Sequence, residues 1–414
     1  MLRRQSAATV RLVRKNSAIA VVALAAAILG AAISLLAAKA TGVAAGKTTT
    51  VYLSGGALDL SRGRNEPAAA NVRPLLGNGF KPARIYAARS PGVVTVFAFF
   101  DNAVQHAAQG SGFVVSPRGY ILTSAHVVTD AGDSATTSSA NHVFIGFKDG
   151  DRISAKIVGW DVYDDVALLR VEPRAHKLSP VPLGNSAQVQ AGDPVAAMGS
   201  PFGNEDSIAV GVVSAIHRSI ASLTSTYKVV DAIQTDAPIT HGNSGGPLFD
   251  ARGRVIGINA QIRTDTGDSQ GVGFAVPINA AQRSMRQLAV IGHVVYAYLG
   301  VTTENLTPTL ARHFGYSARD GAIVASVKGG SPAAGAGLHG GNGEETFNGQ
   351  TVTRGGDVIV AVDGQPVATA DDVVRFVSEK LPGEVARLTI LRGGKERVVR
   401  VKLGARPEAP DTNP

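Results

Sequence analysis

Six consecutive residues decide how this 414-residue sequence is interpreted: Gly242-Asn243-Ser244-Gly245-Gly246-Pro247. A serine hydroxyl is a weak nucleophile, so a catalytic serine needs a sharp turn that exposes its oxygen and aims backbone N–H groups at one point. The glycines beside Ser244 permit such a turn, because glycine tolerates positive φ angles and the close approach of other atoms. Taken alone, the same residues also fit an ordinary hairpin turn.

Two further motifs supply the partners that a nucleophilic serine requires. Residues 123–128, Thr-Ser-Ala-His-Val-Val, place His126 at the end of an apolar strand. Residues 161–169 place three acids, Asp161, Asp164 and Asp165, before another apolar strand. A serine needs a histidine as base, and the histidine needs a carboxylate that fixes its tautomer and stabilises the imidazolium. The chain order histidine, aspartate, serine is the chymotrypsin order, so the three motifs together predict nucleophilic hydrolysis.

Composition and charge exclude several other classes of protein. A hydrophobic content of 44% supports a large core, and 17% charged residues argue against a disordered or fibrous chain. The sequence contains no cysteine, which excludes disulfides, thiolate metal sites and a cysteine nucleophile. Residues 1–40 hold six basic and no acidic residues, and so most of the formal net charge of +8. The rest of the chain is nearly neutral, which argues against a nucleic-acid-binding face.

The basic N-terminus precedes a segment that predicts a membrane anchor. Residues 16–38 are 23 uncharged residues, mostly Ala, Val, Leu and Ile. As a helix they span about 34 Å, enough for a hydrocarbon core of about 30 Å. The cations of residues 1–15 predict a cytoplasmic N-terminus and place the rest of the chain outside the cytoplasm. A cleaved signal peptide with Ala38-Lys39-Ala40 as its cleavage site is the alternative, although its apolar core is usually shorter.

The remaining chain divides into a predicted linker, two domains and a tail. Residues 39–79 show no sustained periodicity and are predicted to be the linker, while residues 406–414 form the tail. Residues 80–290 alternate short β-branched runs with turn residues, which predicts a barrel or sandwich closed by a helix over 280–291. Residues 291–405 form a second unit of short strands with a helix over 370–380. The strands predicted most clearly are 93–97, 112–115, 120–123 and 254–258.

With these motifs, the sequence from about residue 82 to residue 404 resembles the HtrA/Deg family, trypsin-like serine proteases followed by a PDZ domain. The resemblance implies a mostly-β fold with a chymotrypsin-like double β-barrel and an α+β PDZ domain. It also implies that His126 is the general base, Asp165 its orienting partner and Ser244 the nucleophile. Family members carry the aspartate immediately before the apolar-Ala-apolar run, so Asp161 and Asp164 are predicted to be turn residues.

The resemblance further predicts the groups that surround the triad. Backbone N–H groups of Gly242 and Ser244 form the oxyanion hole, with Asn243 as a third candidate. Pro238, six residues before the nucleophile, and Ile239 occupy the pocket base, where trypsin-like enzymes that cleave after Lys or Arg carry a carboxylate. The strand expected to pair with substrate and wall the pocket contains Gly271, Val272, Gly273 and Phe274. An ordinary core strand is the alternative for these four residues.

The second domain carries its own predicted binding loop. Tyr298, Leu299, Gly300 and Val301 resemble the PDZ loop that captures a peptide C-terminal carboxylate through backbone N–H groups. The bound peptide would then add as a strand beside the helix over 370–380. Residues 339–354, rich in Gly, Asn and Thr, are predicted to be a surface insertion.

These features predict a single-pass membrane-anchored serine endopeptidase that acts outside the cytoplasm. The resemblance implies unfolded or damaged polypeptides as substrates, peptide C-termini as PDZ partners and a homotrimer as a possible assembly. No metal or cofactor is expected, because the triad supplies base, nucleophile and oxyanion stabilisation itself. The alternative is a peptide-binding or chaperone module that keeps the protease fold without cleaving its ligand.

Overall fold

The computed structural model describes residues 79–100, 107–130, 137–200, 207–225, 227–240, 242–260 and 272–407. The predicted anchor over 16–38 lies outside these residues, as do the predicted linker, apart from Gly79, and the tail beyond Pro407. In the part of the chain that the structure describes, no helix is long and apolar enough to cross a membrane.

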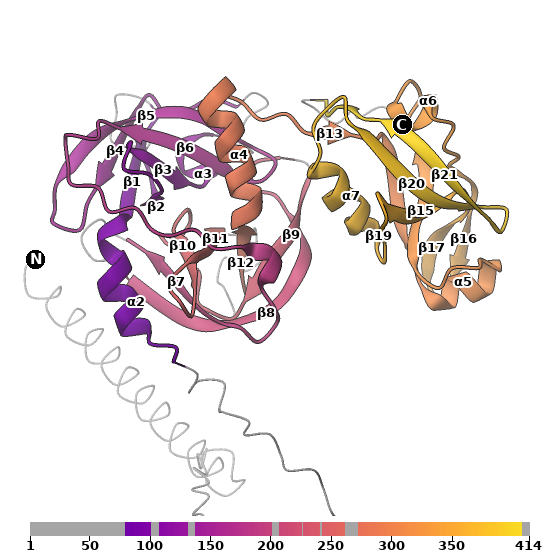
Figure 1. Cartoon of the computed structure of the whole chain (residues 1–414), viewed down its shortest axis with the longest axis horizontal. Helices are drawn as coiled ribbons and strands as arrows, with labels where there is room; N and C mark the ends of the chain where they lie inside the picture. Colours follow the sequence, from indigo (N-terminus) through magenta and orange to yellow (C-terminus); the bar gives the residue numbers. More distant parts are fainter. Residues whose placement is uncertain are drawn as a thin grey trace, which may run out of the picture. The chain divides into compact units, whose positions relative to one another are not determined.

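The first domain begins with a closed six-stranded antiparallel barrel (Figure 1). The strands pair in the order β1-β2-β3-β6-β5-β4. Their bounds are β1 (Val93–Phe99), β2 (Ala107–Val114), β3 (Tyr120–Thr123), β4 (His142–Gly146), β5 (Arg152–Asp161) and β6 (Val166–Val171). Alternate residues point into the barrel, as the two-residue period of a strand requires. Val94, Val96 and Ala98 of β1 therefore share one buried cluster with Ile121 and Leu169.

A second closed barrel follows, with the strands paired in the order β10-β11-β12-β9-β8-β7. Their bounds are β7 (Pro194–Gly199), β8 (Ser207–Ala221), β9 (Lys228–Thr235), β10 (Pro247–Asp250), β11 (Val255–Ala260) and β12 (Gly273–Pro277). Val195, Ile233 and Leu248 belong to the cluster that fills this barrel.

A separate apolar cluster joins the two barrels. It unites Phe113 and Leu122 of the first barrel with Met198 and Phe249 of the second. Helix α4 (Ile278–Ile291) contributes Ile278, Ala281 and Leu288 to the same cluster. The three- and four-residue spacing of its buried side chains is that of one helical face. The shorter helices of this domain are α2 (Pro82–Arg89), η2 (Ser90–Gly92), α3 (Ala125–Val128) and η4 (Ser186–Gln188).

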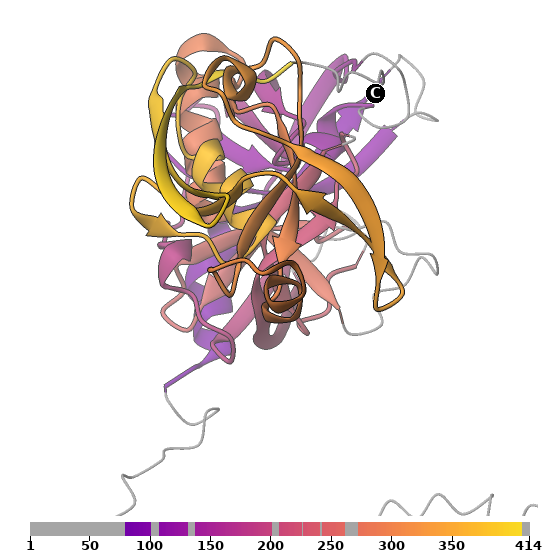
Figure 2. The same ribbon diagram turned by 90° about the vertical axis from the view of Figure 1, so that its right-hand side faces the viewer.

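The second domain is a small sheet with helices, drawn in orange and yellow in Figure 2. Its main sheet runs β14-β15-β18-β20-β21, with β19 paired to β18, and β13 pairs with β22. The strands are β13 (Ala297–Tyr298), β14 (Val301–Leu306), β15 (Gly321–Val327), β18 (Val358–Val362), β19 (Gln365–Pro366), β20 (Val385–Arg392), β21 (Lys395–Lys402) and β22 (Gly404–Ala405). The helices are α5 (Pro308–Phe314), α6 (Pro332–Gly335) and α7 (Ala370–Ser378). The sequence allows a start of α7 at Thr369 or Asp371, and in the structure Thr369 is the N-cap, in a capping box with Asp372.

The predicted mostly-β fold with two barrels and a PDZ-like unit is confirmed in the described residues. Within the predicted insertion at 339–354, the structure has a hairpin that was not predicted, formed by β16 (Gly341–Phe347) and β17 (Gln350–Gly355) with a register shift between Gly341 and Gly343. Asn348 and Gly349 connect the two strands, both with positive φ. Asn-Gly is a strong signal for a two-residue hairpin turn. Its flanks lack the apolar alternation that usually marks strands, which explains why the hairpin was not predicted.

Candidate active site

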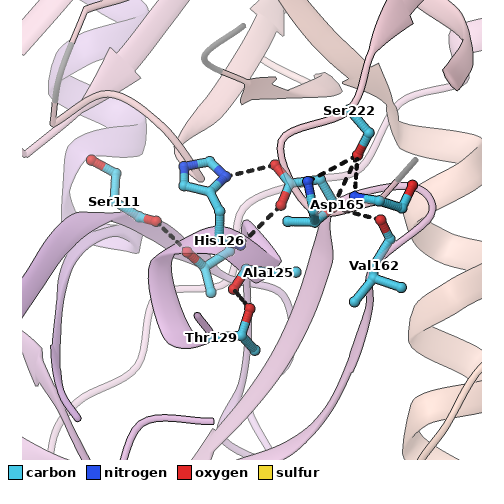
Figure 3. A network of polar contacts seen from close by, with 10 residues as sticks. Ser111, Ala125, His126, Thr129, Val162, Asp165 and Ser222 are labelled. Atoms are coloured by element: carbon cyan, nitrogen blue, oxygen red, sulfur yellow. Dashed lines mark hydrogen bonds and ion pairs between the residues drawn. The ribbon is translucent and has the colours of Figure 1, made fainter. Parts of the chain in front are cut away.

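The structure brings His126 and Asp165 into direct contact in the first barrel (Figure 3). His126 lies in α3, which follows β3 directly, and Asp165 ends the turn between β5 and β6. The carboxylate of Asp165 contacts Nδ1 of the imidazole at 2.8 Å and accepts the backbone N–H of His126 at 2.9 Å. With Nδ1–H donating to the carboxylate, Nε2 is the nitrogen left to accept a proton.

The surroundings of the His126 ring change its pKa in two opposite directions, and the net effect favours the protonated form. Burial disfavours the imidazolium, while the charge of Asp165 and its hydrogen bond favour it. The two effects of Asp165 together outweigh burial, so the pKa of His126 lies above its usual value. Such a histidine is a stronger proton acceptor than one in water.

Asp165 holds an unusual backbone conformation to reach the histidine. Its φ is 52°, a left-handed value that is uncommon outside glycine, and its side chain is buried. Its carbonyl accepts the N–H of Ala125 at 3.2 Å, which ties the turn to α3. Asp161 accepts the backbone N–H groups of Tyr163 and Asp164, so it acts as a turn residue.

Ser244 lies in the turn before β10 and is fastened to strand β2 of the other barrel. Its carbonyl accepts the N–H of Ser111 at 2.8 Å, and the Ser111 hydroxyl donates to the carbonyl of Gly242 at 2.5 Å. Gly245 has a φ of 83°, and a Cβ there would lie 2.3 Å from the carbonyl oxygen of Ser111. Only glycine fits this position, so the turn from the second barrel lies directly against the barrel that carries His126 and Asp165.

Some hydrogen-bonding groups of the Ser244 turn have a partner in the described residues, and others have none. Within the described residues, the hydroxyl of Ser244 has no hydrogen-bond partner. The N–H of Ser244 is also unused by the hydrogen bonds of this part of the chain. The N–H of Asn243 instead donates to the carbonyl of Thr240 at 3.0 Å, so this geometry does not offer Asn243 as the third oxyanion donor that was expected. Catalytic hydrogen bonds are often absent or long until substrate is bound.

The residues predicted for the substrate pocket fall into two groups. Ile239 is buried against β12, since a Cβ on Gly273 would lie 2.9 Å from its Cδ1 atom. Phe274 is also buried, whereas Val272 and Pro238 are exposed. Gly271 lies outside the described residues.

Asp236, the nearest acid to the expected pocket, has a partner of its own. Its carboxylate accepts the backbone N–H of Val212 at 2.7 Å. This contact joins the end of β9 to β8, and it leaves the apolar Ile239 as the residue packed against the predicted substrate strand.

The predicted PDZ loop lines a cavity of about 180 Å³. Tyr298, Leu299, Gly300 and Val301 all face it, and Val373, Val374 and Val377 of α7 line it as well. The carbonyl groups of Leu299 and Gly300 accept N–H groups of the 328–333 segment, at 2.9 and 3.0 Å. The N–H groups of the same two residues are unused among the described hydrogen bonds. Free N–H groups at an apolar groove suit a peptide C-terminal carboxylate.

Sequence reasoning missed two residues that shape the site. Ser111 holds the Ser244 turn, and Asn259 donates its side-chain amide to the carbonyl of Met198 at 3.0 Å while its backbone pairs with Gly245 and Gly246. The available signal was Gly-Ser-Gly inside a strand pattern, because isolated glycines in a strand mark close backbone approach. The described residues contain no group of three His, Asp or Glu side chains placed to hold a metal ion.

Two six-stranded barrels, with a histidine–aspartate pair on one and a glycine-bounded serine turn on the other, define the trypsin-like class of serine protease. A family model described as "Trypsin-like peptidase domain" matches residues 110–258, and one described as "PDZ domain" matches residues 297–403. Among solved structures, an "HtrA-type protease AlgW with tripeptide" is 33% identical with a TM-score of 0.64, and the match covers 80% of this chain and 99% of that one. A serine endoprotease from Yersinia pestis is 28% identical with a TM-score of 0.55, over 79% of this chain and 98% of that one.

Curated relatives agree with these matches. A "Probable periplasmic serine endoprotease DegP-like" from Pseudomonas fluorescens is 38% identical over 299 residues, which is 72% of this chain. A protein of the same description from Pseudomonas fulva is 40% identical over 298 residues. The chain belongs to the HtrA family of trypsin-like serine proteases with a PDZ domain. The match spans 56% of the length of these two relatives.

The contact between His126 and Asp165 makes a prediction about titration. Asp165→Asn removes the negative charge that raises the pKa of His126 and leaves the opposing effect of burial. We therefore expect the His126 pKa to lie above that of free histidine in the wild-type chain and to fall in the variant. NMR of chain labelled with ¹³C in its histidine rings measures this, with the signal assigned from a His126→Gln variant. Equal His126 pKa values in the two proteins would contradict the contact.

Proposed function

We propose that this chain is a serine endopeptidase of extracytoplasmic protein quality control, anchored in the membrane by residues 16–38. Unfolded or damaged polypeptides are its substrates, and its PDZ domain binds peptide C-termini. The observation that carries the proposal is the two-point contact of Asp165 with His126, at 2.8 and 2.9 Å, beside a serine turn fastened to the same barrel.

The geometry supports acyl-enzyme chemistry in the following order. The hydroxyl of Ser244 attacks the peptide carbonyl while Nε2 of His126 takes its proton, and Asp165 stabilises the imidazolium. The N–H of Ser244, together with that of Gly242, donates to the oxyanion that forms. His126 then gives its proton to the leaving amine, and the bond to the amine breaks. Water attacks the acyl-enzyme with His126 again as base, which releases the acid and restores Ser244.

The location and partners follow from the N-terminal sequence and from the family. The basic residues before the apolar segment favour an N-terminus inside the cytoplasm and domains outside it. The descriptions of the Pseudomonas relatives as periplasmic agree with an extracytoplasmic site. The cavity at Leu299 and Gly300 supports capture of a peptide carboxylate, and a homotrimer is a prediction from the family resemblance alone.

One observation favours the second candidate, a chaperone that binds peptides without cleaving them. The hydroxyl of Ser244 makes no hydrogen bond within the described residues, so the nucleophile is not yet joined to His126. Substrate or PDZ ligand could complete this arrangement, whereas a pure binding module would never complete it.

A covalent probe and three variants test the proposed activity. We expect a fluorophosphonate to label Ser244 of the full-length chain. Ser244→Ala, His126→Ala and Asp165→Asn should each lower turnover by at least about 10³-fold, because the three residues act as a unit. Turnover should also fall as the pH drops through the raised pKa of His126, because imidazolium cannot accept the serine proton.

A matched control is Asp250→Asn, which changes a carboxylate that also accepts backbone N–H groups in a hairpin turn, between β10 and β11. This variant should keep wild-type turnover. Absence of labelling in the presence of PDZ ligand would favour the chaperone. Loss of turnover on changing Asp164 but not Asp165 would show that Asp164, rather than Asp165, is the carboxylate that orients His126.

The apolar surroundings of Ile239 predict the residue on the acyl side of the cleaved bond. An unpaired substrate cation there would carry an uncompensated desolvation cost of several kcal/mol. An aliphatic side chain would instead gain roughly 0.8 kcal/mol per buried CH₂. Cleavage of a peptide library should therefore favour Val, Ala, Ile or Leu. A strong preference for Lys or Arg would contradict this and point to Asp236 as a pocket residue.

The anchor has its own test. We expect the full-length chain to stay in the membrane fraction through an alkaline carbonate wash, because the 23 uncharged, mostly apolar residues are long enough to span the hydrocarbon core. Protease added outside the membrane should digest the domains and leave the N-terminus protected. A soluble form that begins near Thr41 would instead support a cleaved signal peptide.

A further inference from the structure

Asp161 is a buried carboxylate that the proposed chemistry does not use. It ends β5, is 2% exposed and accepts four hydrogen bonds. One oxygen accepts the backbone N–H groups of Tyr163 at 3.0 Å and Asp164 at 3.3 Å. The other accepts the hydroxyl groups of Ser284 at 2.6 Å and Tyr296 at 2.5 Å.

The two backbone contacts lie inside the turn that carries Asp165. Asp161 pairs with Val166 across the hairpin of β5 and β6, so residues 162–165 form the whole turn. The left-handed conformation of Asp165 is uncommon for a residue other than glycine, although aspartate tolerates it better than most, and such conformations persist where the surroundings fix them. The oxygen of Asp161 that binds two consecutive turn N–H groups provides that restraint from within the turn.

The two hydroxyl contacts hold the carboxylate itself from outside the turn. Ser284 lies on α4, and Tyr296 directly precedes β13, the first strand of the PDZ domain. Burial and the nearby carboxylates raise the pKa of Tyr296 well above its usual value, so its hydroxyl keeps the proton that it donates. Within the described residues, Asp161 therefore links the catalytic turn to the segment between the two domains.

Burial and a neighbouring charge raise the pKa of Asp161, so this carboxylate gains or loses its proton near pH 6. Burial and the charge of Asp164 raise its pKa to about 6, against the effect of its hydrogen bonds. Asp164 in turn pairs with Arg283 of α4 at 3.0 Å. Above pH 6 the Asp161 carboxylate is therefore mostly ionised and accepts strong hydrogen bonds from its four donors. Below pH 6 it is mostly protonated and is a weaker hydrogen-bond acceptor.

We propose that Asp161 is a positioning residue for peptide hydrolysis, which holds the 162–165 turn so that Asp165 reaches His126, and that Tyr296 supports it. This inference rests on the proposed function for its kinetic effects. The contact between Asp165 and His126 can be measured separately, because it sets the pKa of His126 whether or not the chain cleaves peptides.

The test compares Asp161→Asn and Tyr296→Phe in the full-length chain in detergent micelles. Asparagine keeps the size of the side chain but places an amide where two donors meet, and phenylalanine removes one hydroxyl. We expect Asp161→Asn to lower kcat by about 10- to 100-fold, as a misplacement of about 1 Å does, with KM unchanged. The His126 pKa, measured by NMR, should fall because Asp165 moves away. Tyr296→Phe should change both quantities in the same direction by less.

Two matched variants serve as controls. Asp250→Asn alters another turn carboxylate, and Tyr316→Phe removes another partly buried hydroxyl, which donates to Gly355 in the PDZ domain. Both should keep wild-type kcat and His126 pKa. The ratio of wild-type to Asp161→Asn activity should also shrink as the pH falls below 6, where the wild-type carboxylate is itself neutral.

A wild-type His126 pKa in a folded Asp161→Asn chain would overturn the proposal, even if kcat fell. If Asp161→Asn fails to fold, the Tyr296→Phe variant provides the test. Wild-type values of both kcat and the His126 pKa in Tyr296→Phe would then overturn the proposal. If the wild-type chain is not labelled by fluorophosphonate, the proposed function fails, but the His126 pKa still tests whether Asp161 positions Asp165.

Discussion

The candidate active site depends on one attachment, that of the Ser244 turn to strand β2. His126 and Asp165 belong to the first barrel and Ser244 to the second, so their relative positions are set where the barrels touch. Ser111 fixes that point with a backbone and a side-chain hydrogen bond. Because the space at Gly245 admits no side chain, the turn cannot adopt a different register against β2. The apolar cluster between the barrels then holds the two halves together.

The same site contains a local conflict that the surrounding structure has to resolve. A φ of 52° is uncommon for any residue other than glycine, and Asp165 holds it while its carboxylate reaches His126. Its cost is offset by the contacts of Asp165 with α3 and by the hydrogen bonds of Asp161 inside the turn. Functional residues in sparsely populated conformations require this kind of support from neighbours. We therefore expect the position of the Asp165 carboxylate against His126 to depend on residues that do not touch the substrate.

How much could be predicted from the sequence follows from the range of each interaction. The Ser244 turn, the strand that precedes His126 and the helix that begins near residue 370 were predicted because their signals are a few adjacent residues. Asp161 was predicted to be a turn residue, and it accepts two N–H groups of its own turn. Its contacts with Ser284 and Tyr296 could not be predicted, since both residues lie more than a hundred residues away in the chain. The 341–355 hairpin was missed for another reason, because both of its strands are largely solvated and lack an apolar pattern.

Both predicted binding sites present backbone N–H groups to an anionic oxygen. In the proposed function, the ligand at Ser244 is the oxyanion of the reaction, and the ligand at Leu299 and Gly300 is a peptide carboxylate. Substitutions other than to proline keep the backbone donor, so we expect each site to be controlled by the groups that hold its turn. Ser111 has this position beside Ser244, and Ser331, whose hydroxyl donates to the Gly300 carbonyl at 3.3 Å, has it beside the PDZ loop. We therefore expect small polar residues that bind turn carbonyls to set the direction in which the N–H groups point, and with it the affinity for the anion.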